Sequence, residues 1–122
     1  YPESHYGRDA LVGVGLFLSH FVAEGKSMTA LKATYPQYFI SKNKLTLSPD
    51  MDVDKILEGL KKKYASEEIT DIDGVKIDFK DGWVHLRKSN TEPIIRIYSE
   101  SKDEAAANQL AEEVIKVAQS LY

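Results

Sequence analysis

The sequence of 122 residues contains no cysteine. Neither a disulfide framework nor a thiolate metal site can therefore form, and a reducing compartment is permitted. A long apolar run is also missing, because the most apolar stretch, residues 10–18, is far shorter than the roughly 20 residues that span a bilayer. We expect this stretch to form a buried helix in a cytoplasmic protein that has no membrane partner.

An excess of positive charge is absent as well. The 16 Lys and Arg residues face 19 Asp and Glu residues, which gives a formal net charge of −3. This balance argues against a nucleic-acid partner that needs a broad basic surface, although a small anion site can exist on an acidic protein.

Metal-ligand spacing and the common catalytic motifs are missing too. The three histidines, His5, His20 and His85, are widely separated along the chain. The acids at positions 50, 52 and 54 lack the glycine and the terminal glutamate of a calcium loop. No glycine-rich nucleotide loop and no serine nucleophile elbow occurs. We expect this chain to bind no metal.

Helix signals dominate the first part of the chain. Asp9 can cap a helix that runs to Glu24 and ends at Gly25, and Ser27 can cap a short helix through Ala33. The first of these helices is apolar almost all the way round, so other structure must enclose it. We place a domain boundary after residue 40.

The remaining residues, 41–122, combine strand and helix patterns. An apolar stripe at helical spacing follows Asp52, and another follows Ser101 and Glu104, which form a capping box. The run at 94–98 is typical of a strand. We predict an α+β domain with a largely antiparallel four-stranded sheet and two helices on one face, preceded by the helical segment.

Two Asp-Gly pairs, at 73–74 and 81–82, mark the turns of a predicted meander. The second turn places Phe79 opposite Val84, which gives the hairpin one apolar face. By the same logic the first turn places Ile72 opposite Val75.

The densest group of hydrogen-bond donors lies in the loop R-K-S-N-T-E-P, residues 87–93. Arg87 offers a planar fork that matches phosphate oxygens, and the hydroxyls of Ser89 and Thr91 and the amide of Asn90 can donate to the remaining oxygens. A hairpin does not require so many donors, but Ser, Asn, Thr and Pro are also ordinary loop residues. A phosphate site and an ordinary loop both stay open on these residues alone.

The run R-K-S-N-T-E-P-I-I-R-I-Y, from Arg87 to Tyr98, closely resembles the phosphate-binding loop of the α-D-phosphohexomutases, a family that includes phosphoglucosamine, phosphomannose and phosphoglucose mutases. The runs D-G-V-K-I, D-G-W-V-H-L-R and H-Y-G-R-D-A-L-V-G, which begin at residues 73, 81 and 5, resemble the same family. Members have four domains around a cleft. The resemblance implies that residues 1–40 are the last helical part of the third domain with a linker, and that residues 41–122 are the complete fourth domain.

The resemblance also implies a function. The family moves a phosphoryl group between the 1- and 6-positions of a hexose phosphate, from a phosphoserine and with magnesium, through a bisphosphorylated sugar. Arg87, Ser89, Asn90 and Thr91 would hold the phosphate that is not reacting, while Arg96 would support the loop or add positive potential. The serine loop, the magnesium ligands and the sugar-recognition loop are not in these residues. We therefore expect no catalytic residue in this chain, no activity of the chain alone, and two partners: a hexose phosphate and the remaining domains of the same polypeptide.

Two other functions stay open. The chain could be a stand-alone module for phosphorylated ligands or for a partner protein, without catalysis. It could also be a structural interaction domain that forms a defined oligomer through its first helix. The first residue is Tyr1 rather than Met, which leads us to expect a segment of a longer protein.

Overall fold

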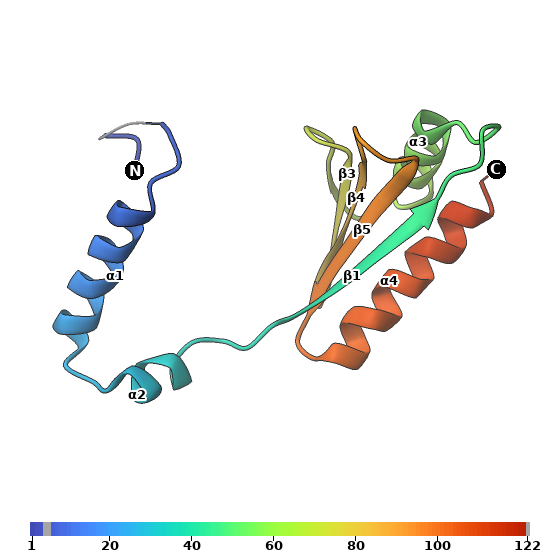
Figure 1. Cartoon of the computed structure of the whole chain (residues 1–122). Helices are drawn as coiled ribbons and strands as arrows, with labels where there is room; N and C mark the ends of the chain where they lie inside the picture. Colours follow the sequence, from blue (N-terminus) through green and yellow to red (C-terminus); the bar gives the residue numbers. More distant parts are fainter. Residues whose placement is uncertain (4–5, 122) are drawn as a thin grey trace. The chain divides into compact units, whose positions relative to one another are not determined.

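The computed structural model describes residues 1–3 and 6–121, so His5, where one of the quoted runs begins, lies outside the described residues. The chain divides into two compact units, Tyr1–Pro36 and Gln37–Tyr122. Each unit is considered by itself (Figure 1). The assignment of residues 1–40 and 41–122 to successive mutase domains stays a prediction.

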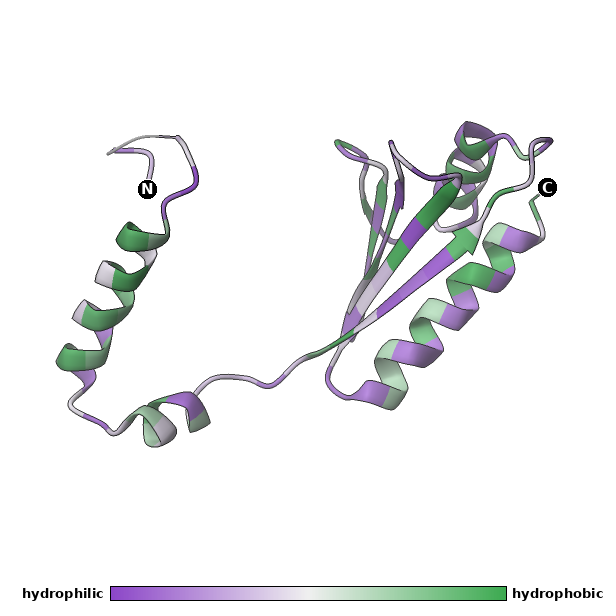
Figure 2. Cartoon of the chain, viewed as in Figure 1, coloured by the Kyte–Doolittle hydropathy of each residue, from purple (hydrophilic) through white to green (hydrophobic). Residues whose placement is uncertain are grey.

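The first unit contains α1 (Ala10–Glu24) and α2 (Met28–Ala33), as predicted. The Asp9 side chain accepts the Val12 N–H at 2.9 Å, and Gly25 ends α1 with a left-handed φ of 60°. All of α1 is described, and none of its residues is buried within this chain. Figure 2 shows apolar residues along most of this helix. The first unit by itself therefore does not supply the cover that the apolar sides of α1 require.

The second unit is built on one antiparallel sheet. Its strands are β1 (Phe39–Thr46), β2 (Glu68–Thr70), β3 (Val75–Phe79), β4 (Gly82–Lys88) and β5 (Ile94–Ser101). Their order across the sheet is β1-β5-β4-β3-β2. The predicted α+β class is confirmed, but the sheet has five strands rather than four. The segments before and after the helix at residues 53–63 form the two edge strands, β1 and β2, which pair with β5 and β3.

Two helices, α3 (Val53–Lys63) and α4 (Glu104–Gln119), cover one face of this sheet, as predicted. Helix α4 contacts β1, β4 and β5, and α3 contacts β3 and α4. Ile56, Leu60 and Val114 of these helices pack with the inward side chains of the central strands, and all three are fully buried. Among the described residues of this unit, no helix covers the opposite face, which we call the helix-free face, and its side chains are those between the buried positions of each strand.

The hairpin between β3 and β4 differs from the predicted register. Phe79 pairs with Gly82 and Ile77 with Val84, so the pairing of Phe79 with Val84 was wrong by two residues. The two-residue turn consists of residues 80 and 81, and in this described turn no residue has a positive φ. A shift of two residues keeps every side chain on its face, so the apolar face was still predicted correctly.

Gly82 serves strand packing instead of the turn. A Cβ at this position would lie 2.3 Å from the Glu100 carbonyl oxygen on the neighbouring strand β5. Only glycine permits this approach.

The pairing predicted for the preceding hairpin was wrong as well. Ile69 pairs with Ile77. Ile72 lies in a four-residue loop, and the residue is 93% exposed. Gly74 in this loop has a φ of 79°, and a Cβ there would lie 2.2 Å from the Leu86 carbonyl oxygen. The loop, residues 71–74, therefore lies tightly against β4.

The N-terminus of α4 is also capped differently. Asp103 accepts the Ala106 N–H at 2.8 Å and is the N-cap, whereas the predicted cap Ser101 is the last residue of β5. The Ser101 hydroxyl instead donates to the Asp81 carbonyl oxygen at 2.6 Å. The strand continues too far for Ser101 to reach the helix end.

Candidate anion-binding site

The loop between β4 and β5 is held at both ends by backbone hydrogen bonds. Ser89 N–H donates to the Ile94 carbonyl at 3.0 Å, and Ile94 N–H donates to the Glu92 carbonyl at 2.8 Å. The Pro93 carbonyl accepts from Leu47 N–H at 2.9 Å, which ties the loop to the end of β1. These hydrogen bonds fix the loop to the ends of the strands β1 and β5.

A pocket of about 190 Å³ lies in this loop. Its walls consist of Arg87, Lys88, Ser89, Asn90, Thr91 and Arg96. The four residues predicted as a phosphate site are therefore brought together. Lys88 was not predicted, and its position directly after Arg87 in the loop motif was the signal for it.

The hydroxyls of the loop converge on one another. The Ser89 oxygen lies 3.5 Å from both the Thr91 hydroxyl and the Thr91 N–H, and Ser89 is buried. Contacts of this length are weak, so both hydroxyls keep the capacity to bond to an oxygen placed between them. Asn90 and Thr91 are exposed, so a ligand can reach this side of the loop from solvent.

Three cationic side chains lie in a row across the sheet beside the pocket. Arg87 on β4 pairs with Arg96 on β5, and Arg96 pairs with Lys44 on β1. Directly opposed like charges destabilise a sheet. These three side chains stand on the helix-free face and take no part in the hydrophobic core. Their combined positive charge favours the binding of an anion beside them.

Each arginine of this row has one carboxylate neighbour. Arg87 Nε lies 3.0 Å from Asp73 Oδ2, and Arg96 Nη2 lies 3.9 Å from Glu92 Oε2. All four side chains are about half exposed, so each pair is weak. The contact between Arg87 and Asp73 is made through Nε, the guanidinium nitrogen nearest the chain. The loop bearing Asp73 was predicted as a tight turn, and its contact with Arg87 was missed.

A second, smaller hollow of about 90 Å³ adjoins the row. It is lined by His85, Arg87, Arg96 and Tyr98, all on the helix-free face. Arg87 and Arg96 therefore form a wall shared by two neighbouring hollows, which keeps both guanidinium groups accessible.

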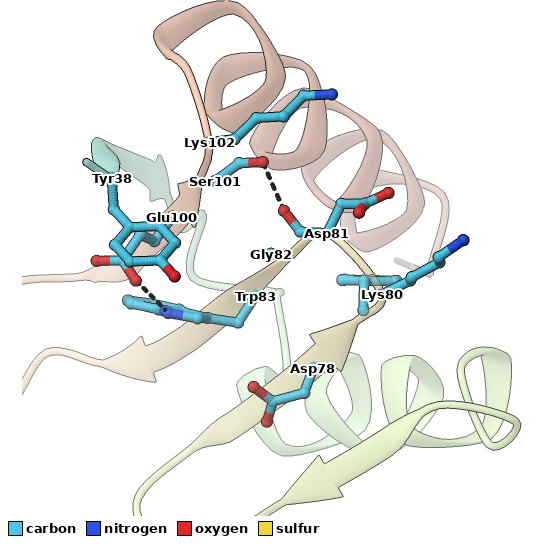
Figure 3. A pocket seen from close by; sticks show the side chains of 10 residues that line it. Tyr38, Asp78, Lys80, Asp81, Gly82, Trp83, Glu100, Ser101 and Lys102 are labelled. Carbon is cyan, nitrogen blue, oxygen red and sulfur yellow. Dashed lines mark hydrogen bonds between the residues drawn. The ribbon is translucent and has the colours of Figure 1, made fainter. Parts of the chain in front are cut away.

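Another pocket of the second unit lies at the other end of the strands and has different chemistry (Figure 3). Its volume is about 440 Å³. Trp83 Nε1 donates to Glu100 at 3.0 Å, and Lys76 pairs with Asp78 beside the Trp83 ring. The lining of this pocket carries three acids, Asp78, Asp81 and Glu100, against two lysines, Lys80 and Lys102, so it has no excess of positive charge for an anion.

The described residues also contain no metal cluster. Within residues 1–3 and 6–121, no three His, Asp or Glu side chains gather where they could hold an ion.

Helix length bears on membrane association. The longest helix is α4, with 16 residues, and no helix in the described ranges is long and apolar enough to cross a membrane.

Comparison with known families gives one match. Residues 43–117 match the profile of the phosphoglucomutase/phosphomannomutase C-terminal domain. This range contains the whole loop pocket, all three cations of the row and most of the sheet.

Individual relatives agree with this match. The chain is 40% identical over 119 residues to a phosphoglucosamine/phosphogalactosamine mutase of Sulfurisphaera tokodaii, and 38% identical over 119 residues to a phosphoglucomutase/phosphomannomutase of Thermococcus kodakarensis. Each alignment covers 96% of this chain and 26% of the relative. The chain thus spans about a quarter of the length of these curated relatives.

A solved structure shows the same fold. A phosphoglucomutase/phosphomannomutase family protein from Burkholderia thailandensis superimposes with a TM-score of 0.52 at 25% sequence identity. The match covers 74% of this chain and 20% of that protein.

Proposed function

Since the chain belongs to the phosphoglucomutase/phosphomannomutase family, with residues 43–117 as its C-terminal domain, we propose that it binds the substrate phosphate in a hexose-phosphate mutase. The intact enzyme would move a phosphoryl group between the 1- and 6-positions of a hexose through a bisphosphorylated sugar. Supporting this proposal above all is the row formed by Arg87, Arg96 and Lys44 beside a pocket of hydroxyl and amide donors.

The proposed role of the pocket is to hold the phosphate ester that is not reacting. Arg87 would present two parallel N–H donors to two phosphate oxygens, and Ser89 and Thr91 would donate to a third. Arg96 would add positive charge and a second donor group from the facing strand. These donors recognise phosphate and not the sugar, so they suit a reaction in which either end of the hexose must occupy the same pocket.

Holding one phosphate contributes to catalysis by orientation. A phosphate fixed in this pocket limits the positions of the opposite end of the sugar, which raises its effective concentration at the transferring group. We place the transferring group and magnesium in the rest of the polypeptide, so this chain alone should have no mutase activity. The proposal includes a cytoplasmic location, which a chain without cysteine permits.

The experiment is a titration of the 122-residue chain with inorganic phosphate, followed through its backbone amide NMR signals. We expect the amides of residues 88–92 to shift, and we expect Arg87→Ala to weaken binding by about 10- to 100-fold, the loss expected for charge-assisted hydrogen bonds. Lys62→Ala removes the same charge from an exposed helix position and should leave the affinity within about twofold. Equal affinities of the wild-type and Arg87→Ala chains would refute the proposal.

The uncovered helix α1 offers a test of the alternative, a protein-interaction module. Leu11 and Val22 on this helix are 84% and 77% exposed. We propose that the remainder of the mutase polypeptide covers them. Sedimentation of the chain alone should then show weak association without a fixed stoichiometry. A stable dimer that survives dilution would favour the interaction module instead.

A further inference from the structure

The loop that joins β2 to β3 reaches the proposed phosphate pocket through Asp73. Its carboxylate oxygen Oδ2 lies 3.0 Å from Arg87 Nε, on the side of the guanidinium nearest the chain. Asp73 does not line the pocket itself. The residue therefore touches a pocket side chain without standing where the phosphate would bind.

This loop is held in place by two further contacts. The Asp73 carbonyl oxygen lies 2.7 Å from His85 Nε2, which can donate to it. Gly74 packs so closely on the Leu86 carbonyl that no side chain fits there, and its φ of 79° sets the direction of the chain. These contacts at Asp73 and Gly74 thus fix the backbone position from which the Asp73 side chain reaches Arg87.

The nitrogen through which Arg87 contacts Asp73 decides which nitrogens remain for a phosphate. A guanidinium presents donors on two edges, and the Asp73 carboxylate lies beside the edge that contains Nε. The edge formed by the two terminal nitrogens lies away from this contact, and Arg87 lines the pocket, so these nitrogens can bind two phosphate oxygens. An arginine fixed in this way loses less conformational freedom when the phosphate binds.

We propose that Asp73 is a positioning residue, which holds the Arg87 guanidinium in the orientation that receives the phosphate. This inference rests on the proposed function of the loop pocket. It assigns a role in the binding site to a residue of a different hairpin.

A competing effect has the opposite sign, which makes the inference testable. The Asp73 carboxylate is negative and stands near the pocket, so by charge alone it repels phosphate, and its removal should strengthen binding. If Asp73 positions Arg87, its removal should weaken binding instead. The direction of the change in affinity separates the two.

The chain provides a matched control in the same loop. Asp71 carries the same charge two residues away, and its side chain and that of Asp73 are each 61% exposed. Asp71 pairs with Lys61 at 3.1 Å and does not contact Arg87. Asp71→Ala therefore removes an equal charge from the loop and leaves the arginine contact in place.

The experiment is an NMR titration of the wild-type chain, Asp73→Ala, Asp73→Asn, Asp71→Ala and Arg87→Ala with inorganic phosphate. We expect Asp73→Ala to weaken binding about three- to tenfold and Asp71→Ala to bind as tightly as wild type or slightly more tightly. Asp73→Asn, which keeps an acceptor oxygen, should fall between wild type and Asp73→Ala. The Arg87 Nε–H signal should be resolved in the wild-type chain and broadened in Asp73→Ala, a change that a purely structural role of Asp73 does not predict.

Each outcome decides a different point. If Arg87→Ala loses binding while Asp73→Ala binds phosphate at least as tightly as wild type, the positioning role is overturned and the proposed function stands. If Arg87→Ala binds like wild type, or the wild-type chain binds no phosphate, both fall. Circular dichroism of each variant checks folding. If Asp73→Ala does not fold, the phosphate affinity of Asp73→Asn is compared with that of the wild-type chain instead.

Discussion

Arg87 and Arg96 lie directly opposite each other on β4 and β5, and both side chains stand on the helix-free face of the sheet. Two cations in this arrangement repel each other, and their carboxylate neighbours Asp73 and Glu92 offset part of this repulsion. An anion that binds only the folded chain should relieve this repulsion and stabilise the fold.

Removal of Arg96 should therefore affect affinity and stability in opposite directions. Without phosphate, we expect Arg96→Ala to melt at the same temperature as wild type or slightly higher, because the repulsion is gone. With phosphate at about 100 times the wild-type Kd, the wild-type chain should gain about 2.7 kcal/mol and the variant clearly less. Thermal melts with and without phosphate measure both effects.

Lys44 provides a graded comparison for this prediction. It stands next to Arg96 but does not line the pocket. Lys44→Ala should reduce the stabilisation by phosphate less than Arg96→Ala does. An equal rise in melting temperature for wild type and Arg96→Ala would show that Arg96 takes no part in binding.

The close approach of Gly74 to β4 predicts a large effect of a single methyl group. Gly74→Ala places a side chain at a positive φ and against the Leu86 carbonyl, so we expect a loss of about 2–4 kcal/mol in the free energy of unfolding. Gly25→Ala is the matched control, because it has a φ of 60° but no atom within 4 Å of the new methyl group. We expect about 1 kcal/mol or less there.

Urea-induced unfolding of both glycine variants provides the measurement. The two glycines lie in different units, so fluorescence of Trp83 reports the second unit and far-UV circular dichroism reports the helices of both. Similar small losses at both positions would mean that the loop at 71–74 can move away from β4.

The N-cap of α4 gives a further prediction. Asp103→Ala removes the acceptor of the Ala106 N–H and should cost about 1 kcal/mol of stability. Glu104→Ala, which would break the capping box suggested by the sequence, should change stability by less than about 0.5 kcal/mol. Chemical denaturation measures the stability of both variants. A larger loss of stability in Glu104→Ala than in Asp103→Ala would support the capping box and contradict the assignment of Asp103 as the N-cap.

The stability of the second unit should fall at alkaline pH because of Tyr64. Burial raises the pKa of the Tyr64 phenol above its ordinary value of 10.0, and the negative charge of Glu113 adds to this shift. The folded chain therefore keeps the proton at a pH at which the unfolded chain has released it. The stability that this difference provides is fully present below pH 10 and is lost as the pH rises through the folded-state pKa.

Tyr64→Phe tests this prediction with little change in packing. The ring packs edge-on against Phe79 with centroids 5.5 Å apart, and phenylalanine keeps that contact. The two proteins should be about equally stable near pH 7, while above pH 10 the variant should lose less stability than wild type. Parallel losses of stability in urea unfolding at both pH values would contradict the assignment.

The sequence predicted the helices well because their signals are local. Asp9, Ser27 and Asp52 cap helices where expected, and each acts through its own backbone neighbours. The cap of α4 failed because it depends on where β5 ends, and strand length is decided by the partner strands on both sides.

The hairpin registers show where local reasoning stops. An Asp-Gly pair suggests a tight turn, but Gly82 is needed for the approach of β5 and Gly74 for the approach of β4. Both requirements come from strands that lie elsewhere in the sequence.

The candidate site was predicted in part for the same reason. Arg87, Ser89, Asn90 and Thr91 lie within five residues, so a motif can reveal them, and their contact with a ligand stays a prediction. The contact between Asp73 and Arg87 joins two hairpins and depends on the true register of both, which the sequence pattern did not provide.

Strand β1 spans the second unit from one end of the sheet to the other. It begins at Phe39, beside the start of the unit at Gln37, and ends at Thr46, which pairs with Ile94 next to the loop pocket. Eight residues of extended chain measure about 26 Å, so β1 acts as a lever arm between the chain entry and the pocket. A swivel of roughly 10° at the entry displaces the pocket by about 4–5 Å, more than the length of a hydrogen bond. A small angular change at Gln37 would thus alter the distance between the proposed donors and a phosphate.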